Sequence, residues 1–459
     1  MMMLKLFWEK LLTTIWFVPT VIATGLVMSS IGFLNIDQHV DIRNWPWVNT
    51  LQIGTTGVRQ VLAVTTSAII SLTGVVFSIS VVALTLAANQ FGSKILHNFL
   101  RDNKAKMVLG LLIGSFLYGL ALLSFIDTHE TTSQQMPIIS VAINLLLTVL
   151  SIIGLIYFIH YISTTIQADQ IISLIGEELS QAIDESLLDL DEQATTDSVK
   201  QRWDITVHAM PSVTMAASVS GYVEFVDIEQ LKKIAENENQ HIELFLRPGD
   251  FVIENLPILR VFQEGGINED CYDRLRLCIS LGRKRTPFSD IEFAIMQLLQ
   301  IALRALSPGV NDSLTAIACI DWLSSSLGRM ANREFPLEYL EDSNGVVRIK
   351  KRELRFADAV DTMFHPLRQN VTNNEMVMIH LLETISRILQ VSRKPQYSEA
   401  LYNHAKLIME SSKESFCSPS DTQEIIKRFE KCQIIYEHAR AKLQADRKPV
   451  FESSARFKV

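Results

Sequence analysis

Four long stretches without a charged side chain lie in the N-terminal part of this chain, and no such stretch follows them. They are Leu11–Ile36, Gln60–Ser93, Met107–Ile126 and Thr131–Ala168. Each supplies at least the ~20 residues that a helix needs to cross a ~30 Å hydrocarbon layer, and buried helices of soluble proteins rarely stay uncharged for so long. The sequence therefore predicts an integral membrane α-helical region, with spans at about residues 14–34, 61–88, 107–126 and 138–163.

The charges between these stretches predict the orientation of the spans, because Lys and Arg near span ends stay in the cytoplasm. Lys5 and Lys10 precede the first stretch. The segment between the second and third stretches is basic, with Lys94, Arg101, Lys104 and Lys106 against Asp102. The segment after the third stretch is acidic, with Asp127 and Glu130. We expect both termini to be cytoplasmic.

The residues after the spans form a large acidic region. Of the 42 Lys+Arg and 50 Asp+Glu in the chain, residues 1–168 hold eight and six, so residues 169–459 hold 34 and 44 and carry a net charge of −10. Such a region repels the phosphates of nucleic acid, which is therefore not expected as a partner. All five cysteines lie there, at spacings typical of no zinc site, and we interpret them as free thiols.

The hydrophobic period of this region changes along the chain. Residues 169–200 are predicted as a helical stalk, because Ile171, Ile175 and Leu179 recur on one helix face. In residues 201–285, apolar and polar side chains alternate as they do in β-strands, and residues typical of turns separate these runs. This pattern predicts a small β-rich domain, either a barrel or a sandwich. Its candidate strands are Val213–Ala217, Val219–Val226, His241–Leu246, Phe251–Ile253 and Ile258–Phe262, with a short helix at Ile228–Ala235.

Residues 286–445 show the apolar spacing that is typical of helices and predict a helical bundle. The expected helices are Pro287–Leu306, Asp312–Arg329, Ala357–Arg368, Glu375–Val391, Tyr397–Ser412 and Asp421–Gln444, with one strand at Val346–Lys350. We expect residues 446–459 to form a flexible tail. The predicted fold class is thus a membrane region of four transmembrane helices followed by a cytoplasmic α+β region.

Five runs of residues together resemble one known family. They are Gly74-Val75-Val76-Phe77-Ser78, Gln90-Phe91-Gly92, Tyr157-Phe158-Ile159-His160, Arg247-Pro248-Gly249-Asp250-Phe251 and Ala-Leu-Arg-Ala-Leu-Ser-Pro-Gly-Val-Asn-Asp from Ala302 to Asp312. Over nearly its whole length the chain resembles the bacterial membrane family called domain of unknown function 2254. It departs from the expected pattern at Ser313-Leu314 and lacks a glycine near Asn255, and both differences touch turns. The resemblance implies a multi-pass protein of the bacterial inner membrane and assigns no catalytic role to any residue.

The second span carries a stripe of small and polar residues on one helix face, Ser67, Ser71, Gly74, Ser78 and Thr85. One interpretation is close helix packing, since small residues let helices approach and hydroxyls can bond across the interface. The other is a water-filled path lined by several copies of this helix and narrowed by Phe77 or Phe91. The absence of charge from the four spans disfavours proton relays and transporters of charged substrates, but it permits a weakly selective channel.

Two basic segments are candidate contacts for anions. Lys94 and Arg101 lie on the polar face of a predicted interfacial helix after the second span, where they would touch anionic lipid and anchor the chain. Arg283, Lys284 and Arg285 run into a predicted helix N-terminus, a combination that suits a phosphate, a nucleotide or a lipid headgroup. The alternative for this second segment is a solvated basic turn, or one paired with acids of the same region.

The sequence contains no catalytic signature of the metalloprotease, Walker A, Gly-x-Ser-x-Gly or paired-cysteine type, so neither an enzymatic activity nor a cofactor is expected. Two functions stay open. In the first, the chain forms a homo-oligomeric, channel-like conduit in the lipid bilayer, lined by the second span and regulated by the cytoplasmic region. In the second, it is a non-conducting, membrane-anchored sensor or scaffold that binds an anionic small ligand or a partner protein. The stripe favours the first function, and the size of the cytoplasmic region favours the second.

Overall fold

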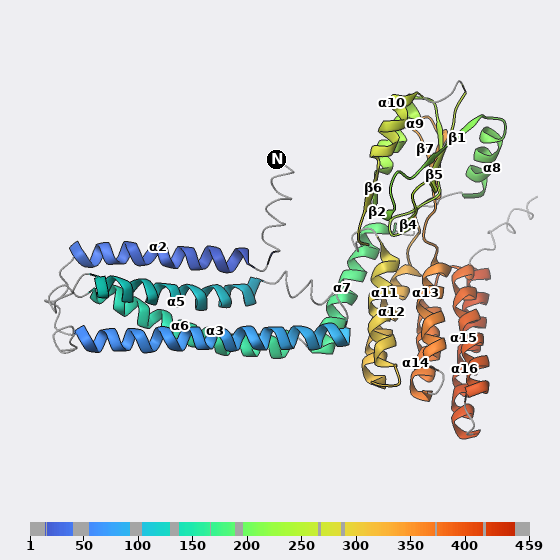
Figure 1. The fold of residues 1–459 in the computed structure, drawn as a ribbon. Coiled ribbons are helices and arrows are strands. Elements are labelled where there is room, and N and C mark those ends of the chain that lie inside the picture. The colour runs from blue at the N-terminus through green and yellow to red at the C-terminus, as the bar shows by residue number, and fades with distance from the viewer. Residues whose placement is uncertain are drawn as a thin grey trace, which may run out of the picture. The chain divides into compact units, whose positions relative to one another are not determined.

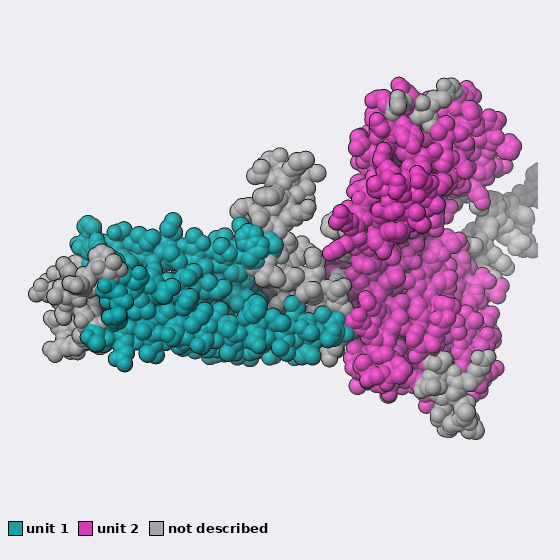
Figure 2. Space-filling model, in the orientation of Figure 1, with its two compact units in different colours: residues 1–171 teal, residues 172–459 magenta. Residues whose placement is uncertain are grey.

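The computed structural model contains two compact units, an N-terminal unit of residues 1–171 and a C-terminal unit of residues 172–459 (Figures 1 and 2). The residues that the structure describes are 14, 16–39, 55–91, 103–128, 137–165, 167–188, 196–264, 268–285, 290–371, 374–415 and 419–445. The boundary between the units falls three residues after the predicted end of the membrane region at Ala168.

The N-terminal unit consists, in the part that is described, of four long apolar helices that lie side by side (Figure 1). They are α2 (Phe17–His39), α3 (Thr55–Phe91), α5 (Asn103–Thr128) and α6 (Ile138–Thr165). All four are long and apolar enough to cross a membrane, as the uncharged stretches predicted. Helix α3 is the longest at 37 residues, and a rise of ~1.5 Å per residue makes it longer than a ~30 Å hydrocarbon layer requires.

Helix α5 holds the N-terminal unit together, because it packs against α2, α3 and α6. Apolar side chains fill most of these contacts, with Leu112, Leu122 and Phe158 fully buried. At one end of the unit, the Asp37 carboxylate of α2 accepts hydrogen bonds from the backbone N–H groups of Ile139 and Ser140, both at 2.9 Å. These N–H groups belong to the first turn of α6, where helical backbone lacks internal partners, so α2 supplies the cap for α6.

At Gly119 of α5, side chains from two other helices, α3 and α6, come close to the backbone. A Cβ atom placed there would lie 2.3 Å from Thr66 Oγ1 of α3 and 3.0 Å from Asn144 Oδ1 of α6. Both side chains are buried, and neither oxygen has a hydrogen-bond partner among the described residues. The oxygens therefore occupy the space that the missing side chain leaves, and the approach of α5 to its neighbours depends on glycine at this position.

The C-terminal unit begins within helix α7 (Ala168–Ser186), and α8 (Thr196–Val207) follows. The predicted stalk is thus interrupted: α7 ends at Ser186, and Leu188 pairs with Glu334 through backbone hydrogen bonds of 2.9 Å in both directions. This pairing takes the backbone of Leu188 out of the helix. Helix α8 places Trp203 in a buried aromatic contact with His241, Phe262 and Tyr339.

Two sheets make up the β-rich part, and a strand lies at each of the five positions predicted between residues 213 and 262. The larger sheet has the order β1-β5-β3-β8-β7 and the smaller the order β4-β2-β6. The strands are β1 (Ser212–Ala216), β2 (Gly221–Val226), β3 (His241–Leu244), β4 (Phe251–Val252), β5 (Pro257–Phe262), β6 (Ile279–Gly282), β7 (Tyr339–Glu341) and β8 (Val347–Lys350); helices α9 (Ile228–Asn237) and α10 (Glu269–Leu277) accompany them.

The larger sheet takes strands from two distant parts of the sequence. Strand β8 pairs in parallel with β3, and Ile242 lies opposite Ile349. The strand expected at Val346–Lys350 therefore belongs to the β-rich part, although it lies within the residues that were predicted as a helical bundle. Its burial explains this placement, because Ile349 is fully buried in the same apolar core as Ile242 and Leu259.

The turn between β7 and β8 is built around the buried carboxylate of Asp342. This group accepts hydrogen bonds from the N–H groups of Asn344 and Val346, each at 2.9 Å, and from Arg348 Nε at 2.8 Å. Burial by itself would raise the pKa of Asp342, but these three hydrogen bonds together outweigh it and lower the pKa below its usual range.

Six helices complete the C-terminal unit at the positions where the sequence predicted them. They are α11 (Ile291–Ala305), α12 (Ser313–Met330), α13 (Phe356–Asn370), α14 (Glu375–Val391), α15 (Pro395–Ser415) and α16 (Pro419–Ala445). They pack in a layered group in which α11 contacts α12 and α13, and α14 contacts α12, α15 and α16. Caps define several N-termini, such as Asp290 at α11 and Asp312 at α12.

We expect Gly119→Ala to destabilise the N-terminal unit by about 1–3 kcal/mol, the usual cost of overpacking a tight core. The reason is that the new Cβ would lie 2.3 Å from Thr66 Oγ1, so that α3 or α5 has to move. Thermal unfolding of the purified protein in detergent, followed by size-exclusion chromatography, measures the effect. Gly32→Ala on α2 is the matched control, since nothing lies within 4 Å of its Cβ position. Equal melting temperatures for the two variants would contradict this account of the contact.

We expect Asp342→Asn to lower the stability of the C-terminal unit at neutral pH. Because the folded-state pKa of Asp342 is lowered, its carboxylate stabilises the fold above its ordinary pKa of about 3.9 and loses this effect as the pH falls through the folded-state value. The difference in urea midpoint between wild type and variant should thus be largest at neutral pH and shrink below about pH 4. Asp270→Asn, at a side chain that is 81% exposed, serves as control and should show no such pH-dependent gap.

Candidate functional site

The small and polar stripe of α3 lies on the outer face of the N-terminal unit. All five predicted residues, Ser67, Ser71, Gly74, Ser78 and Thr85, are exposed. The residues of α3 that pack against the other helices, such as Leu62, Ile69 and Val76, are almost fully buried. With ~100° per residue, these two sets lie on opposite sides of the helix, roughly half a turn apart. The stripe therefore makes no contact that builds the described part of the unit.

Space around the stripe is open. Among the residues that the structure describes, no atom lies within 4 Å of the position where Gly74 would carry a Cβ. The hydroxyls of Ser71 and Thr85 donate to backbone oxygens of their own helix, those of Ser67 at 2.9 Å and Val81 at 2.8 Å. Their donors are thus satisfied without a neighbouring helix, and their oxygen lone pairs are left on the outer face.

Sequence reasoning missed two residues that extend the stripe. Gln60 and Asn89 are exposed and lie on the same helix face, one towards each end of α3. The stripe thus runs along most of the helix, and its apolar interruption between Ser78 and Thr85 is Val81 and Val82. The amide residues were identifiable from helical spacing alone, but they lie near the limits of the uncharged stretch.

The other predicted membrane residues are Phe77, Phe91, Lys94 and Arg101, and among them the structure describes the side chain of Phe77. Phe77 is 62% exposed, but it lies about 80° around the helix from the stripe. Phe91 is the last residue of α3, and its side chain lies outside the described residues. Lys94 and Arg101 also lie outside them, so their predicted contact with anionic lipid stays a prediction.

The basic segment before α11 differs from its predicted geometry. Helix α11 begins at Ile291 and not at Pro287, and the Asp290 carboxylate caps its N-terminus by accepting from Phe293 N at 2.9 Å. The same carboxylate accepts a hydrogen bond from Arg285 Nε. The helix end is thus occupied by an acid of the chain itself, whereas the side chains of Arg283 and Lys284 are exposed.

Arg285 belongs to a charge network that joins the β-rich part to the helices. Its guanidinium lies 3.5 Å from Glu292, which also accepts from Arg247 at 2.7 Å and from the Thr362 hydroxyl at 3.0 Å. Asp250 accepts from the backbone N–H of Arg247 at 3.0 Å. A cavity of 70 Å³ adjoins this network. Because acids and bases satisfy one another here, the arrangement serves to hold the two parts together.

Helix α7 contacts α12 at two described points. The indole of Trp322 lies against Gly176, where a Cβ would come within 2.2 Å of the ring. Nearer the end of α7, the Asp184 carboxylate accepts from Arg329 at 2.7 Å and from Arg333 at 3.0 Å. These contacts seat the first helix of the C-terminal unit on the group of helices that follows.

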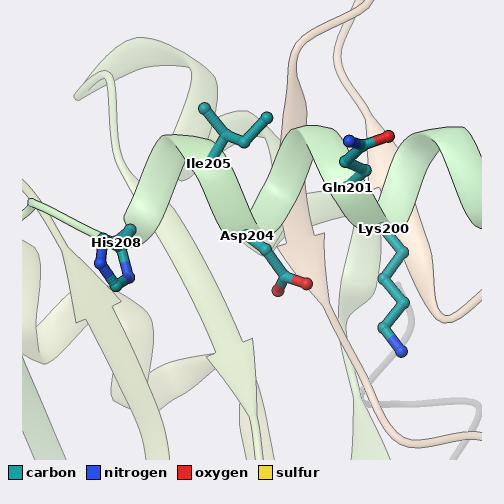
Figure 3. Close-up of a pocket in the computed structure, with 5 residues that line it drawn as sticks. All are labelled: Lys200, Gln201, Asp204, Ile205 and His208. Carbon is teal, nitrogen blue, oxygen red and sulfur yellow. The ribbon is translucent and has the colours of Figure 1, made fainter.

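A surface depression of 560 Å³ lies beside α8 (Figure 3). Its described lining consists of Lys200, Gln201, Asp204 and Ile205 of α8 and His208 of the turn directly after it. The residues come from a single face without a convergent partner element, so the depression offers no built binding geometry among the described residues.

Three of the buried cysteines are not activated as nucleophiles. Burial raises the pKa of Cys319 to about 12, and burial likewise raises the pKa values of Cys278 and Cys432 to about 11. Among the described residues, no group of three or more His, Cys, Asp and Glu side chains is placed to hold a metal ion.

The chain is similar in sequence to proteins of two mycobacteria. An uncharacterized protein of Mycobacterium bovis and one of Mycobacterium tuberculosis are each 27% identical to this chain over 419 residues, which cover 89% of this chain and 78% of theirs. No solved structure matches. A family model described as "Predicted membrane protein (DUF2254)" matches residues 13–387, a range that contains all four apolar helices and most of the C-terminal unit. The chain therefore belongs to the membrane protein family of domain of unknown function 2254.

Proposed function

We propose that this protein forms a homo-oligomeric, channel-like conduit in the bacterial inner membrane, with the stripe of α3 facing a shared central path. Both termini and the C-terminal unit lie in the cytoplasm in this proposal, in keeping with the basic segments that flank the first and second spans. The observation that carries it is the outward position of the stripe, opposite the side on which α3 packs against its own unit.

Contact with lipid alone does not explain why this face of α3 carries small and hydroxyl side chains. The outer faces of membrane helices are normally covered by large apolar side chains, as α6 is by Leu146, Ile153 and Ile156. Small residues and hydroxyls instead suit a place where helices meet or where water is present. A stripe that its own unit leaves uncovered is thus best explained by contact with other copies of α3 around a path.

The chemistry of the stripe favours weak selectivity. Between Ser67 and Thr85 it contains hydroxyls and a glycine but no ionisable residue. Hydroxyl oxygens can replace part of the hydration shell of an ion, whereas discrimination by charge requires rings of charged side chains. We therefore expect small hydrated ions to pass with little preference.

The C-terminal unit would regulate such a conduit through α7. This helix follows the last membrane helix with a single intervening pair of residues, 166 and 167, and it is seated on α12 by Gly176 and Asp184. A change in how α7 sits on α12 has a direct covalent route to α6. No enzymatic step and no cofactor enter this proposal.

A non-conducting sensor or scaffold is the second candidate. The C-terminal unit of residues 172–459 is larger than the N-terminal unit, which favours a role for the cytoplasmic part in binding a ligand or a partner protein. The stripe would then pack copies of α3 together without enclosing water. The two candidates differ in conductance but share the contact between copies.

We expect purified wild-type protein to give discrete currents in planar bilayers and Ser78→Trp to abolish them, because an indole on the stripe would plug a narrow path. Leu86→Trp is the matched control: it lies about two helical turns from Ser78, is 55% exposed, and faces about 90° away from the stripe. Its currents should equal those of wild type. Silence from well-folded wild type over a range of voltage and tension would reject the conduit and favour the scaffold.

We expect Ser78→Cys to form disulfide-linked dimers in membranes on mild oxidation, and Leu86→Cys, about 90° away from the stripe, to stay monomeric on denaturing gels. The reason is that only the stripe meets the next copy. Four native cysteines are buried, and Cys417→Ser removes the fifth from both variants. Cross-linking at Leu86 but not at Ser78 would show that another face of α3 forms the interface, and the stripe would then line nothing.

A further inference from the structure

The turn between α11 and α12, residues 306–312, carries exposed apolar side chains. It belongs to the run from Ala302 to Asp312 through which the chain resembles its family, and neither candidate function makes use of it. Val310 in this turn is 63% exposed, and Leu314 in the first turn of α12 is 72% exposed. Exposed large apolar side chains that gather at one place mark a contact surface.

A third exposed apolar side chain lies at the start of α14. Asn374, which caps this helix, donates from Nδ2 to the Ser313 hydroxyl at 2.5 Å. The first turns of α12 and α14 are therefore neighbours. Met376, in the first turn of α14, is 55% exposed. We call the set of Val310, Leu314 and Met376 the apolar tip.

The backbone of the turn pairs within itself. The Val310 N–H donates to Ser307 O at 3.0 Å, and the Asp312 N–H donates to Ala305 O at 2.8 Å. The Asp312 carboxylate caps α12 and accepts from Thr315 N at 3.1 Å. These polar groups keep their partners when the turn leaves bulk water, so that its transfer to a less polar surrounding costs less.

Helix α7 shows which end of the helical group carries the apolar tip. The indole of Trp322 on α12 packs on Gly176 of α7. Further along both helices, Arg329 donates to the Asp184 carboxylate at 2.7 Å. Because the later contact joins later residues of both helices, α7 and α12 run in the same direction.

The apolar tip lies at the end where the chain arrives from the membrane helices. Eight residues before the contact of Gly176 with Trp322 stand Ala168 on α7 and Leu314 on α12. With the same rise of ~1.5 Å per residue in both helices, Leu314 is level with the start of α7. The last apolar helix, α6, ends at Thr165, and residues 166 and 167 connect it to α7. The covalent chain thus holds this end of the helical group close to the bilayer surface at which α6 ends.

The β-rich part joins the opposite end of the helical group. Its Arg247 pairs with Glu292 in the first turn of α11, and the 15 residues of α11 separate this junction from the turn that follows the helix. Leu277 at the end of α10 is 86% exposed and belongs to the β-rich part. It therefore provides an equally apolar and exposed control away from the start of α7.

We propose that the apolar tip contacts the lipid bilayer, with Val310, Leu314 and Met376 entering the headgroup layer at the surface where α6 ends. Apolar side chains gain free energy there because they exchange water for the upper part of the acyl chains. Lipid is the occupant because the chain itself brings the tip to the bilayer. The C-terminal unit is then held at the membrane through α7 and through the tip. This inference requires neither conduction nor contact between copies.

Quenching of single labels by lipid tests this contact. Leu314→Cys and Leu277→Cys are each made in full-length Cys417→Ser protein, in which the four other cysteines are buried. Each is labelled with bimane and placed in nanodiscs of phosphatidylglycerol and phosphatidylethanolamine, part of which carries a nitroxide on the headgroup. We expect the nitroxide to reduce emission at Leu314 by about twofold or more, because the label lies in the headgroup layer, and to leave emission at Leu277 nearly unchanged.

Charges placed on the tip should break the contact. In a protein labelled at Met376→Cys, adding Val310→Glu and Leu314→Glu should reduce quenching to the level measured at Leu277, because carboxylates stay in water. Ile253→Glu with Leu277→Glu, two exposed apolar positions of the β-rich part, is the matched control and should leave quenching at Met376 unchanged. All four substituted side chains are exposed, and size-exclusion chromatography checks that both variants stay folded.

Two results would overturn the proposal. The first is equal quenching at Leu314 and Leu277, or quenching at Met376 that the two added charges do not change. The second is a label at Leu314 that shifts to the blue but is not quenched by the nitroxide, together with disulfide-linked dimers of unlabelled Leu314→Cys. That result would assign the apolar tip to contact with a second copy of the chain.

Discussion

The hydrocarbon layer offers no hydrogen-bond partner, and the N-terminal unit is arranged around this constraint. Its backbone groups are paired within four helices, and hydroxyls such as those of Ser71 and Thr85 donate to their own helix. The free N–H groups at the start of α6 are met by Asp37 of α2. Where polar side chains meet in the interior, at Thr66 and Asn144, the glycine at position 119 lets the helices close around them.

The lack of hydrogen-bond partners in the hydrocarbon layer also bears on the outer face of α3. Polar groups inside the unit are needed to join its helices, but the stripe from Ser67 to Thr85 joins nothing in the described part of the unit. Such a surface is expected where copies of the chain meet, and a shared water-filled path is the use of it that we propose. Copies of the chain can meet through the stripe without enclosing a water-filled path, so contact between copies does not by itself imply conduction.

The C-terminal unit uses charge in two different ways. Around Glu292, acids and arginines are matched and bind the β-rich part to the helices, so the predicted anion site at Arg285 is engaged in structure. Around Asp184, one carboxylate accepts hydrogen bonds from both Arg329 and Arg333 and so joins the end of α7 to the end of α12.

The sequence by itself determined the elements that depend on local pattern. The four apolar helices, the five strands between residues 212 and 262 and the six later helices follow from hydrophobic period and turn residues, and the family follows from short runs such as that ending at Asp312. Sequence reasoning missed α8, α10, β6 and β7, which are short or polar and gain their stability from what they pack against. Trp203 of α8, for example, is buried only because Tyr339 and Phe262 come together from distant parts of the chain.

Only the tertiary structure decided which surfaces are free and which charges are matched. The stripe of α3 was visible in the sequence, but whether it faces its own unit or faces outward depends on where α5 and α6 pack. Likewise, Arg285 and Arg329 have the same side-chain chemistry, and they differ because folding places two acids beside the first and a shared one beside the second. Local pattern fixes periodicity, whereas contact between residues far apart in the sequence fixes the partner of each side chain, and function depends on those partners.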